Sequence, residues 1–149
     1  MSEILKVVFD TQIYLRAFGN PTSACGRLLN EWSPYYLLHW TNEIEVEILD
    51  VLRRPKVRAK FPSLSDKTET RVKEILAKGI HVEVQPNDLE PICRDPKDDI
   101  FLACAKVAQA DYLISEDNDL LVIGQHHTTR IIKVAAFMNI LEQHANKAD

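Results

Sequence analysis

The strongest constraint on the fold is the regular alternation of short apolar runs with longer segments of helical periodicity. The first run, residues 4–9 (ILKVVF), is mostly apolar and β-branched, which predicts a strand buried on both faces. Four further strands are predicted at residues 35–40, 80–84, 111–115 and 130–134, the third of them at an edge. Helices are predicted at residues 11–18, 22–32, 43–54, 65–78, 95–109, 117–122 and 135–144. This order predicts an α/β sandwich around a mainly parallel sheet.

The composition is that of one soluble globular domain, residues 1–149. Hydrophobic residues make up 46% and charged residues 27% of the chain, a balance typical of a protein with a single packed core. No apolar run approaches the ~20 residues of a membrane span, and the first residues show no signal-peptide pattern. We therefore expect a cytoplasmic protein without membrane contact.

Cysteine and histidine, the usual ligands of zinc, are few. Cys25, Cys93 and Cys104 lie far apart in the sequence, which favours reduced thiols over disulfides. The adjacent His126 and His127 are interpreted as part of a polar loop. A zinc site is not expected on this basis.

Carboxylates gather where the predicted strands end. Asp10 directly follows the first strand, and Asp117 lies two residues after the fourth. Asp98 and Asp99 lie in the first turn of the helix before the fourth strand, and Glu47 lies inside the helix after the second. If the first and fourth strands are neighbours, these groups converge at the C-terminal edge of the sheet. Hard divalent cations such as Mg²⁺ or Mn²⁺ would offset their repulsion and could activate water against a phosphodiester.

Most of these acids also have a simpler explanation. An aspartate in a first helical turn caps the helix or favours its dipole, which would account for Asp98, Asp117 and Asp119. Helical spacing places Glu45 and Glu47 equally close to the apolar stripe, on opposite flanks, and does not choose between them. The convergence is therefore stronger evidence than any single residue.

The basic residues are concentrated in one short run. The net charge of −4 is unfavourable for a protein that binds nucleic acid. Five of the 18 basic residues nevertheless lie within eight positions, namely Arg53, Arg54, Lys56, Arg58 and Lys60. The first four of these could guide RNA. Alternatively, the run complements the dipole of a helix that ends at Pro55 and continues as a solvated loop.

Four motifs resemble, in the same order, those of one known family. Residues 7–13 (VVFDTQI) resemble an opening strand followed by Asp-Thr-Asn, and residues 47–56 (EILDVLRRPK) resemble Glu-Leu-x-x-Val-Leu-x-Arg-Pro-Lys. Residues 95–103 (DPKDDIFLA) are similar to Asp-Pro-x-Asp-Asp-x-Phe-Leu-Ala, and residues 110–121 (ADYLISEDNDLL) to Ala-Asp-Tyr-Leu-Val-Thr-x-Asp-x-Asp-Leu-Leu. The family is that of the PIN domains, and within it the VapC-like toxins of toxin–antitoxin systems. The resemblance extends over residues 5–138.

This resemblance implies a three-layer sandwich whose five-stranded parallel sheet has the order 3-2-1-4-5. It also implies an endoribonuclease that depends on Mg²⁺ or Mn²⁺ and commonly forms a homodimer. Such a toxin would cleave an RNA substrate and would be inhibited by a partner antitoxin protein.

The resemblance also assigns roles to residues, and it selects Glu47 over Glu45. The residues that would bind the metal and catalyse hydrolysis are Asp10, Glu47, Asp99 and Asp117. Those with an auxiliary role are Asp98, Asp119 and, through their hydroxyl groups, Thr11 and Ser115.

One position departs from the family pattern, because Gln12 stands where the family has asparagine. Its side chain is one methylene longer, which would shift a hydrogen bond beside the site. A catalytically weak or inactive PIN-like module that binds RNA or protein is therefore an alternative, as is a plain α/β interaction module. A haloacid-dehalogenase-like phosphatase is disfavoured, since it needs a second aspartate at the position of Gln12. A receiver domain is disfavoured because its paired acids and late lysine are not evident.

Overall fold

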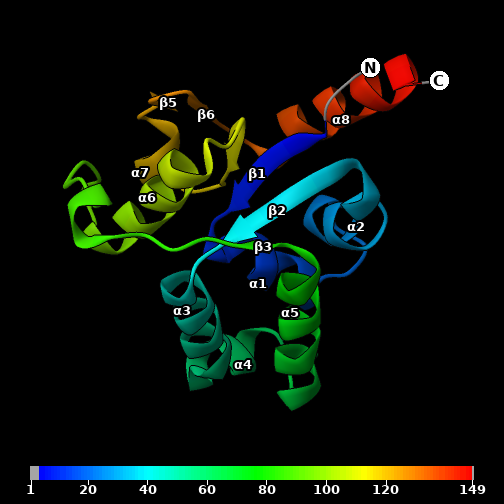
Figure 1. The fold of residues 1–149 in the computed structure, drawn as a ribbon. Coiled ribbons are helices and arrows are strands. Elements are labelled where there is room, and N and C mark those ends of the chain that lie inside the picture. The colour runs from blue at the N-terminus through cyan, green and yellow to red at the C-terminus, as the bar shows by residue number, and fades with distance from the viewer. Residues whose placement is uncertain (1–3, 149) are drawn as a thin grey trace.

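The computed structural model describes residues 4–148, and its strands form one sheet (Figure 1). The strands are β1 (Leu5–Phe9), β2 (Tyr36–Trp40), β3 (Ile80–His81), β4 (Tyr112–Ile114), β5 (Gln125–His126) and β6 (Thr129–Ile132). The α-helices are α1 (Thr11–Gly19), α2 (Ala24–Asn30), α3 (Asn42–Arg53), α4 (Pro55–Lys60), α5 (Asp66–Lys78), α6 (Asp99–Ala108), α7 (Asn118–Leu121) and α8 (Val134–Ala148). Short 3-10 helices lie at Ser33–Tyr35, Pro86–Asp88 and Pro96–Asp98. None of the helices within residues 4–148 is long and apolar enough to cross a membrane.

The sheet has the order β3-β2-β1-β4-β6-β5. Five neighbouring strands, β3, β2, β1, β4 and β6, are parallel to one another. Their order is the one expected for the five predicted strands. β5, however, pairs antiparallel with β6. The expectation of a five-stranded parallel sheet is therefore wrong, because the sheet is mixed and has six strands.

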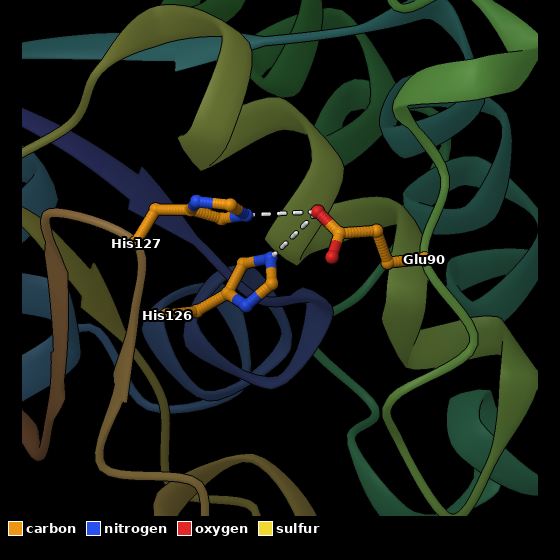
Figure 2. Close-up of side chains that lie close together, drawn as sticks. All are labelled: Glu90, His126 and His127. Carbon is orange, nitrogen blue, oxygen red and sulfur yellow. Dashed lines mark hydrogen bonds and ion pairs between the residues drawn. The ribbon is translucent and has the colours of Figure 1, made fainter.

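The additional strand belongs to a tight hairpin. His126 pairs with Thr129, so that His127 and Thr128 alone connect β5 to β6. Turns of this length usually place Gly or Asn where φ is positive, but here His127 adopts a φ of 52°. The interpretation of the two histidines as a polar loop is also wrong. His126 lies in a strand, His127 lies in the turn, and both rings face Glu90 (Figure 2).

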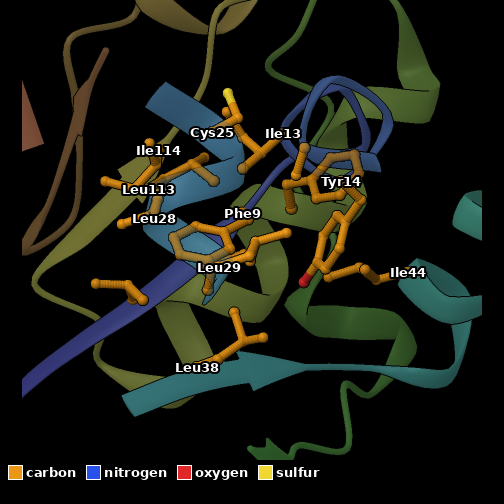
Figure 3. Packing of buried hydrophobic residues seen from close by; sticks show 14 of the residues in the cluster. Phe9, Ile13, Tyr14, Cys25, Leu28, Leu29, Leu38, Ile44, Leu113 and Ile114 are labelled. Atoms are coloured by element: carbon orange, nitrogen blue, oxygen red, sulfur yellow. The ribbon is translucent and has the colours of Figure 1, made fainter. Parts of the chain in front are cut away.

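Helices cover both faces of the sheet. α6 packs against β1, β2 and β4 on one face. On the other face, the Tyr36 ring lies 5.2 Å from that of Phe9 and 6.2 Å from that of Phe137 in α8. The Tyr36 hydroxyl donates to the Leu28 carbonyl of α2 at 2.9 Å. Figure 3 shows the core around Phe9, in which strand and helix side chains interdigitate. This packing holds β1 at the centre of the sheet.

Several element boundaries differ from the sequence expectation. Pro55 follows the end of α3, as predicted, but it also begins α4 where a loop was expected. Proline fits there because the first helical turn does not need its missing N–H. The helix expected at 95–109 is divided into the 3-10 turn Pro96–Asp98 and α6. β3 is two residues long, not five.

Candidate active site

The C-terminal ends of β1 and β4 lie side by side at one edge of the sheet. Phe9 pairs with Ile114 at the last position of both strands. Asp10 follows at once, and its N–H donates to the Ile114 carbonyl at 3.2 Å. Ser115 follows β4, and Asp117 comes two residues later. The first and fourth strands are thus neighbours, and both acids lie at the sheet edge where α/β proteins bind ligands.

Asp10 is almost fully buried, with 3% of its surface exposed. It caps α1, accepting a hydrogen bond from the Ile13 N–H at 3.2 Å, and its other oxygen accepts one from the Ser115 hydroxyl. Burial, and to a smaller degree the charge of Asp117, raise the pKa of Asp10, these hydrogen bonds lower it only in part, and the net result is a pKa of about 6. The protein therefore does not fully compensate the negative charge of this carboxylate.

Helix α3 supplies Glu47. Thr41 caps this helix by accepting a hydrogen bond from the Ile44 N–H at 3.2 Å, and the apolar face of the helix packs into the core. Glu47 then faces the site, where its Oε2 accepts a hydrogen bond from Thr11 Oγ1 at 2.7 Å. Glu45 is not among the residues that line the site. Helical spacing alone did not choose between Glu45 and Glu47, and in the structure it is Glu47 that lines the cavity.

Asp98, Asp117 and Asp119 each place one carboxylate oxygen within 4.8 Å of the others. Asp117 caps α7 by accepting from the Asp119 N–H at 2.9 Å, and its own N–H donates to Ser115 Oγ at 2.9 Å. Burial, together with the charges of Asp117 and other nearby acids, raises the pKa of Asp98 to about 7. Asp117 therefore both caps a helix and lies among the carboxylates of the site.

Asp99 lies differently. It is buried, with 6% of its surface exposed, and its Oδ1 accepts hydrogen bonds from the Ile92 N–H at 3.2 Å and the Cys93 N–H at 2.8 Å. It is not among the residues that line the site, whereas its neighbour Asp98 is. The family resemblance gave Asp99 the metal-binding role and Asp98 an auxiliary one. Asp98 faces the other carboxylates, and Asp99 holds the connection that precedes α6.

The carboxylates open into a cavity of about 230 Å³. The lining acids are Asp10, Glu47, Asp95, Asp98, Asp117 and Asp119. Arg54 and Lys97 supply basic groups to the same lining. Asp95, the first residue of the helix predicted at 95–109, caps the 3-10 helix Pro96–Asp98 by accepting from the Lys97 N–H at 3.0 Å. Residues 95–98 thus place two acids and one lysine at the cavity. In the sequence, the Asp-Pro-Lys-Asp motif is the only sign that these side chains lie together.

The basic residues between 53 and 60, four of which were predicted to contact RNA, do not form one surface patch in the structure. Arg53 and Arg58 both contact Glu69 of α5, at 2.7 and 3.4 Å. Arg54 pairs with Asp50 at 2.9 Å while it lines the carboxylate cavity. Ion pairs with other helices therefore account for much of this run, which supports a structural role for Arg53 and Arg58.

Lys56, in contrast, lines a second cavity of about 700 Å³ beside the first. Gln12 lines both cavities and so marks where they adjoin. The second cavity is also lined by Arg16, Lys60, the aromatic ring of Phe61 and one acidic residue, Glu116. We call it the basic groove. Arg16 and Phe61 could not be identified from the sequence, because neither belongs to a motif and only the fold brings the residues of α1 and α4 to one cavity.

The chemistry of the carboxylate cavity fits a hard divalent cation. Every acidic donor is an oxygen, the class of ligand that Mg²⁺ and Mn²⁺ prefer. The raised pKa values of Asp10 and Asp98 show that these charges lack sufficient partners within the protein. Asp10, Glu47, Asp98, Asp117 and Asp119 are the residues that could hold such an ion.

Comparisons with known proteins concern the sequence and the fold of this chain. The family model of the PIN domain matches residues 6–119, more than half of the chain. The uncharacterized protein MJ1680 of Methanocaldococcus jannaschii is 29% identical over 120 residues, which cover 78% of this chain and 74% of that protein. The crystal structure of PAE2754 from Pyrobaculum aerophilum has a similar fold, with a TM-score of 0.52 at 15% identity, over 94% of this chain and 98% of that one. PIN domains are generally nucleases that use divalent metal ions. This chain belongs to the PIN-domain family.

Proposed function

We propose that this protein is an endoribonuclease that hydrolyses RNA phosphodiester bonds with Mg²⁺ or Mn²⁺. The observation that carries the proposal is the meeting of carboxylates from separate elements in one cavity at the ends of β1 and β4. Burial, and to a smaller degree the charge of Asp117, raise the pKa of Asp10, so that an ionised carboxylate is costly to hold in this place. Such an arrangement is expected where a bound cation offsets the repulsion.

The proposed ligands are Asp10, Glu47, Asp98 and Asp117, with Asp119 beside them. When bound, a hard divalent cation lowers the pKa of a coordinated water and neutralises charge on the phosphate. The Thr11 hydroxyl holds one oxygen of Glu47, and the Ser115 hydroxyl holds one oxygen of Asp10. These hydrogen bonds fix the orientation of both carboxylates, and an oxygen that accepts one hydrogen bond keeps a second lone pair with which it can bind a metal.

The basic groove provides a path for the RNA strand. Arg16, Lys56 and Lys60 offer positive charge to phosphates, and Phe61 offers a ring on which a base can stack. Because Gln12 lines both cavities, a strand in the groove would reach the carboxylates past this side chain. This path accounts for RNA binding by a chain whose net charge is negative.

Cleavage of structured and unstructured RNA in Mg²⁺, Mn²⁺ or EDTA tests the proposal. We expect metal-dependent cutting by the wild type, none in EDTA, and none by Asp98→Asn. Glu74→Gln, the same kind of change at an exposed residue of α5, should cut as the wild type does. Absence of cutting with either metal, together with retained RNA binding, would identify an inactive binding module instead.

We further propose that the nuclease acts as the toxin of a toxin–antitoxin pair, as a homodimer inhibited by its antitoxin. This part rests on the VapC-like motifs at residues 7–13 and 47–56. Expression of the wild type should arrest growth, and expression of Asp98→Asn should not. Co-expression of the protein encoded next to it should restore growth, and light scattering should give the mass of two chains. Normal growth of cells that express an active enzyme would contradict the toxin role, while the proposed nuclease activity would remain supported.

A further inference from the structure

A second group of metal-ligating side chains lies outside the carboxylate cavity. The Nε2 of His127 lies 2.8 Å from Glu90 Oε1, and the Nε2 of His126 lies 3.6 Å from the same oxygen. Figure 2 shows both imidazole rings directed at this carboxylate. One ligand atom from each of the three residues lies within 4.8 Å of the others. We call this group the Glu90 cluster.

The backbone of the hairpin is shaped so that the two histidines meet. Adjacent residues of a strand direct their side chains to opposite faces of the sheet. His127, however, lies in the turn with a φ of 52°, a conformation that is unfavourable for residues other than Gly and Asn. As a result its ring lies 4.4 Å from that of His126, on the side where Glu90 approaches.

We propose that Glu90, His126 and His127 bind a transition-metal ion, Zn²⁺ above all, at a site separate from the carboxylate cavity. Two imidazole nitrogens and one carboxylate oxygen form a donor set typical of zinc and unsuited to Mg²⁺. Ligands about 2.0 Å from a tetrahedral ion lie about 3.3 Å from one another. The observed distances of 2.8 and 3.6 Å bracket that value, so binding requires only small movements of the side chains.

The protonation states of the cluster favour binding at neutral pH. Burial, and the charge of neighbouring His127, lower the pKa of His126. This keeps the imidazole neutral, the form that binds a metal. Hydrogen bonds from His127 and Lys106 lower the pKa of Glu90 to about 2, so that its carboxylate is ionised. Lys106 Nζ lies 3.0 Å from Glu90 Oε1 and would move to the second carboxylate oxygen when an ion binds.

An ion in this position would strengthen the link between two segments that are far apart in the sequence. Glu90 belongs to the connection before α6, and the histidines belong to the β5–β6 hairpin. Two and three residues after Glu90, the N–H groups of Ile92 and Cys93 donate to Asp99. The site is therefore placed to stabilise the connection on which the buried Asp99 depends, at a distance from the proposed hydrolysis.

Titration of the metal-free protein with Co²⁺, in the presence of excess Mg²⁺, tests the proposal. Co²⁺ at a tetrahedral site absorbs visible light much more strongly than Co²⁺ at an octahedral one. We expect the strong tetrahedral absorption, its loss when Zn²⁺ is added, and affinities at least about a hundredfold weaker in Glu90→Gln and His127→Ala. Glu90 and His127 are both partly exposed, so these substitutions should leave the fold intact.

Two variants serve as controls. His81→Ala removes an exposed histidine that contacts Asn42, and Asp98→Asn removes an acid of the carboxylate cavity. Both should bind Co²⁺ as the wild type does, whatever their effect on RNA cleavage. A wild type without tetrahedral absorption would overturn the proposal, as would absorption that persists in both Glu90→Gln and His127→Ala or that disappears in Asp98→Asn.

Discussion

Thr11 Oγ1 donates a hydrogen bond of 2.7 Å to Glu47 Oε2, and this bond joins the first residue of α1 to the middle of α3. Residues that bind a metal are commonly held by such a neighbour, whose loss weakens binding by about 10- to 100-fold. Asp10 and Thr11 are adjacent in the sequence, and both side chains line the cavity. Thr11 can therefore hold Glu47 beside Asp10.

Thr11→Val should therefore raise the metal concentration needed for half-maximal RNA cleavage by about 10- to 100-fold. Thr11→Ser, which keeps the hydroxyl, should remain close to the wild type. Thr129→Val is the matched control, because it removes a buried hydroxyl that donates to the Ala110 carbonyl at 2.7 Å. That variant should lose stability without a change in metal dependence. Equal metal dependence in Thr11→Val and the wild type would contradict the role of this bond.

Asp98 and Asp99 should respond differently to the same change. Asp98→Asn removes a carboxylate from the cavity and should abolish cleavage with no loss of thermal stability. Asp99→Asn weakens the hydrogen bonds from Ile92 and Cys93, and should lower the free energy of unfolding by roughly 1–2 kcal/mol while part of the activity remains. Urea unfolding and RNA cleavage of both variants check this. Full activity in Asp98→Asn would reverse the assignment.

The metal-free protein should lose stability as the pH rises. The folded-state pKa of Asp10, about 6, lies above its ordinary value of 3.8, so the folded chain binds this proton more tightly than the unfolded chain. The stability linked to Asp10 is therefore complete below about pH 4 and decreases as the pH rises through 6, by about 3 kcal/mol at neutral pH.

Urea unfolding in EDTA, at several pH values between about 4.5 and 7, measures this effect. Asp10→Asn carries no titrating group, so its stability relative to the wild type should increase with pH across that range. Added Mg²⁺ should reduce the difference by stabilising the wild type alone. A difference between the two proteins that does not change with pH would show that the Asp10 charge is compensated.

Charge reversal in the basic groove should weaken substrate binding. Lys56→Glu should raise the KM for RNA several-fold, with a smaller change in kcat, because Lys56 lines the groove and lies outside the carboxylate cavity. Lys67→Glu makes the same change at an exposed residue of α5 and should leave KM unchanged. Equal effects of the two substitutions would indicate only a general influence of net charge.

The positions of the main strands could be predicted because the necessary signals are local, whereas their order was predicted from the family resemblance. The apolar run before Asp10, for example, is visible over a few residues. The β5–β6 hairpin could not, since its turn uses His127 in a conformation for which the sequence gives no sign. The different surroundings of Asp98 and Asp99 could not be predicted from the sequence either. They depend on the backbone N–H groups of the preceding connection, which only the folded chain brings to Asp99.

Both edges of the sheet end in strands of two residues, β3 on one side and β5 on the other. Short edge strands present few unpaired backbone groups to which a strand from another molecule could add. Growth of the sheet by edge-to-edge association is therefore disfavoured, even though the central strands are strongly apolar. Two copies of this chain would accordingly meet through the surfaces of their helices, and the central strands would remain protected from aggregation.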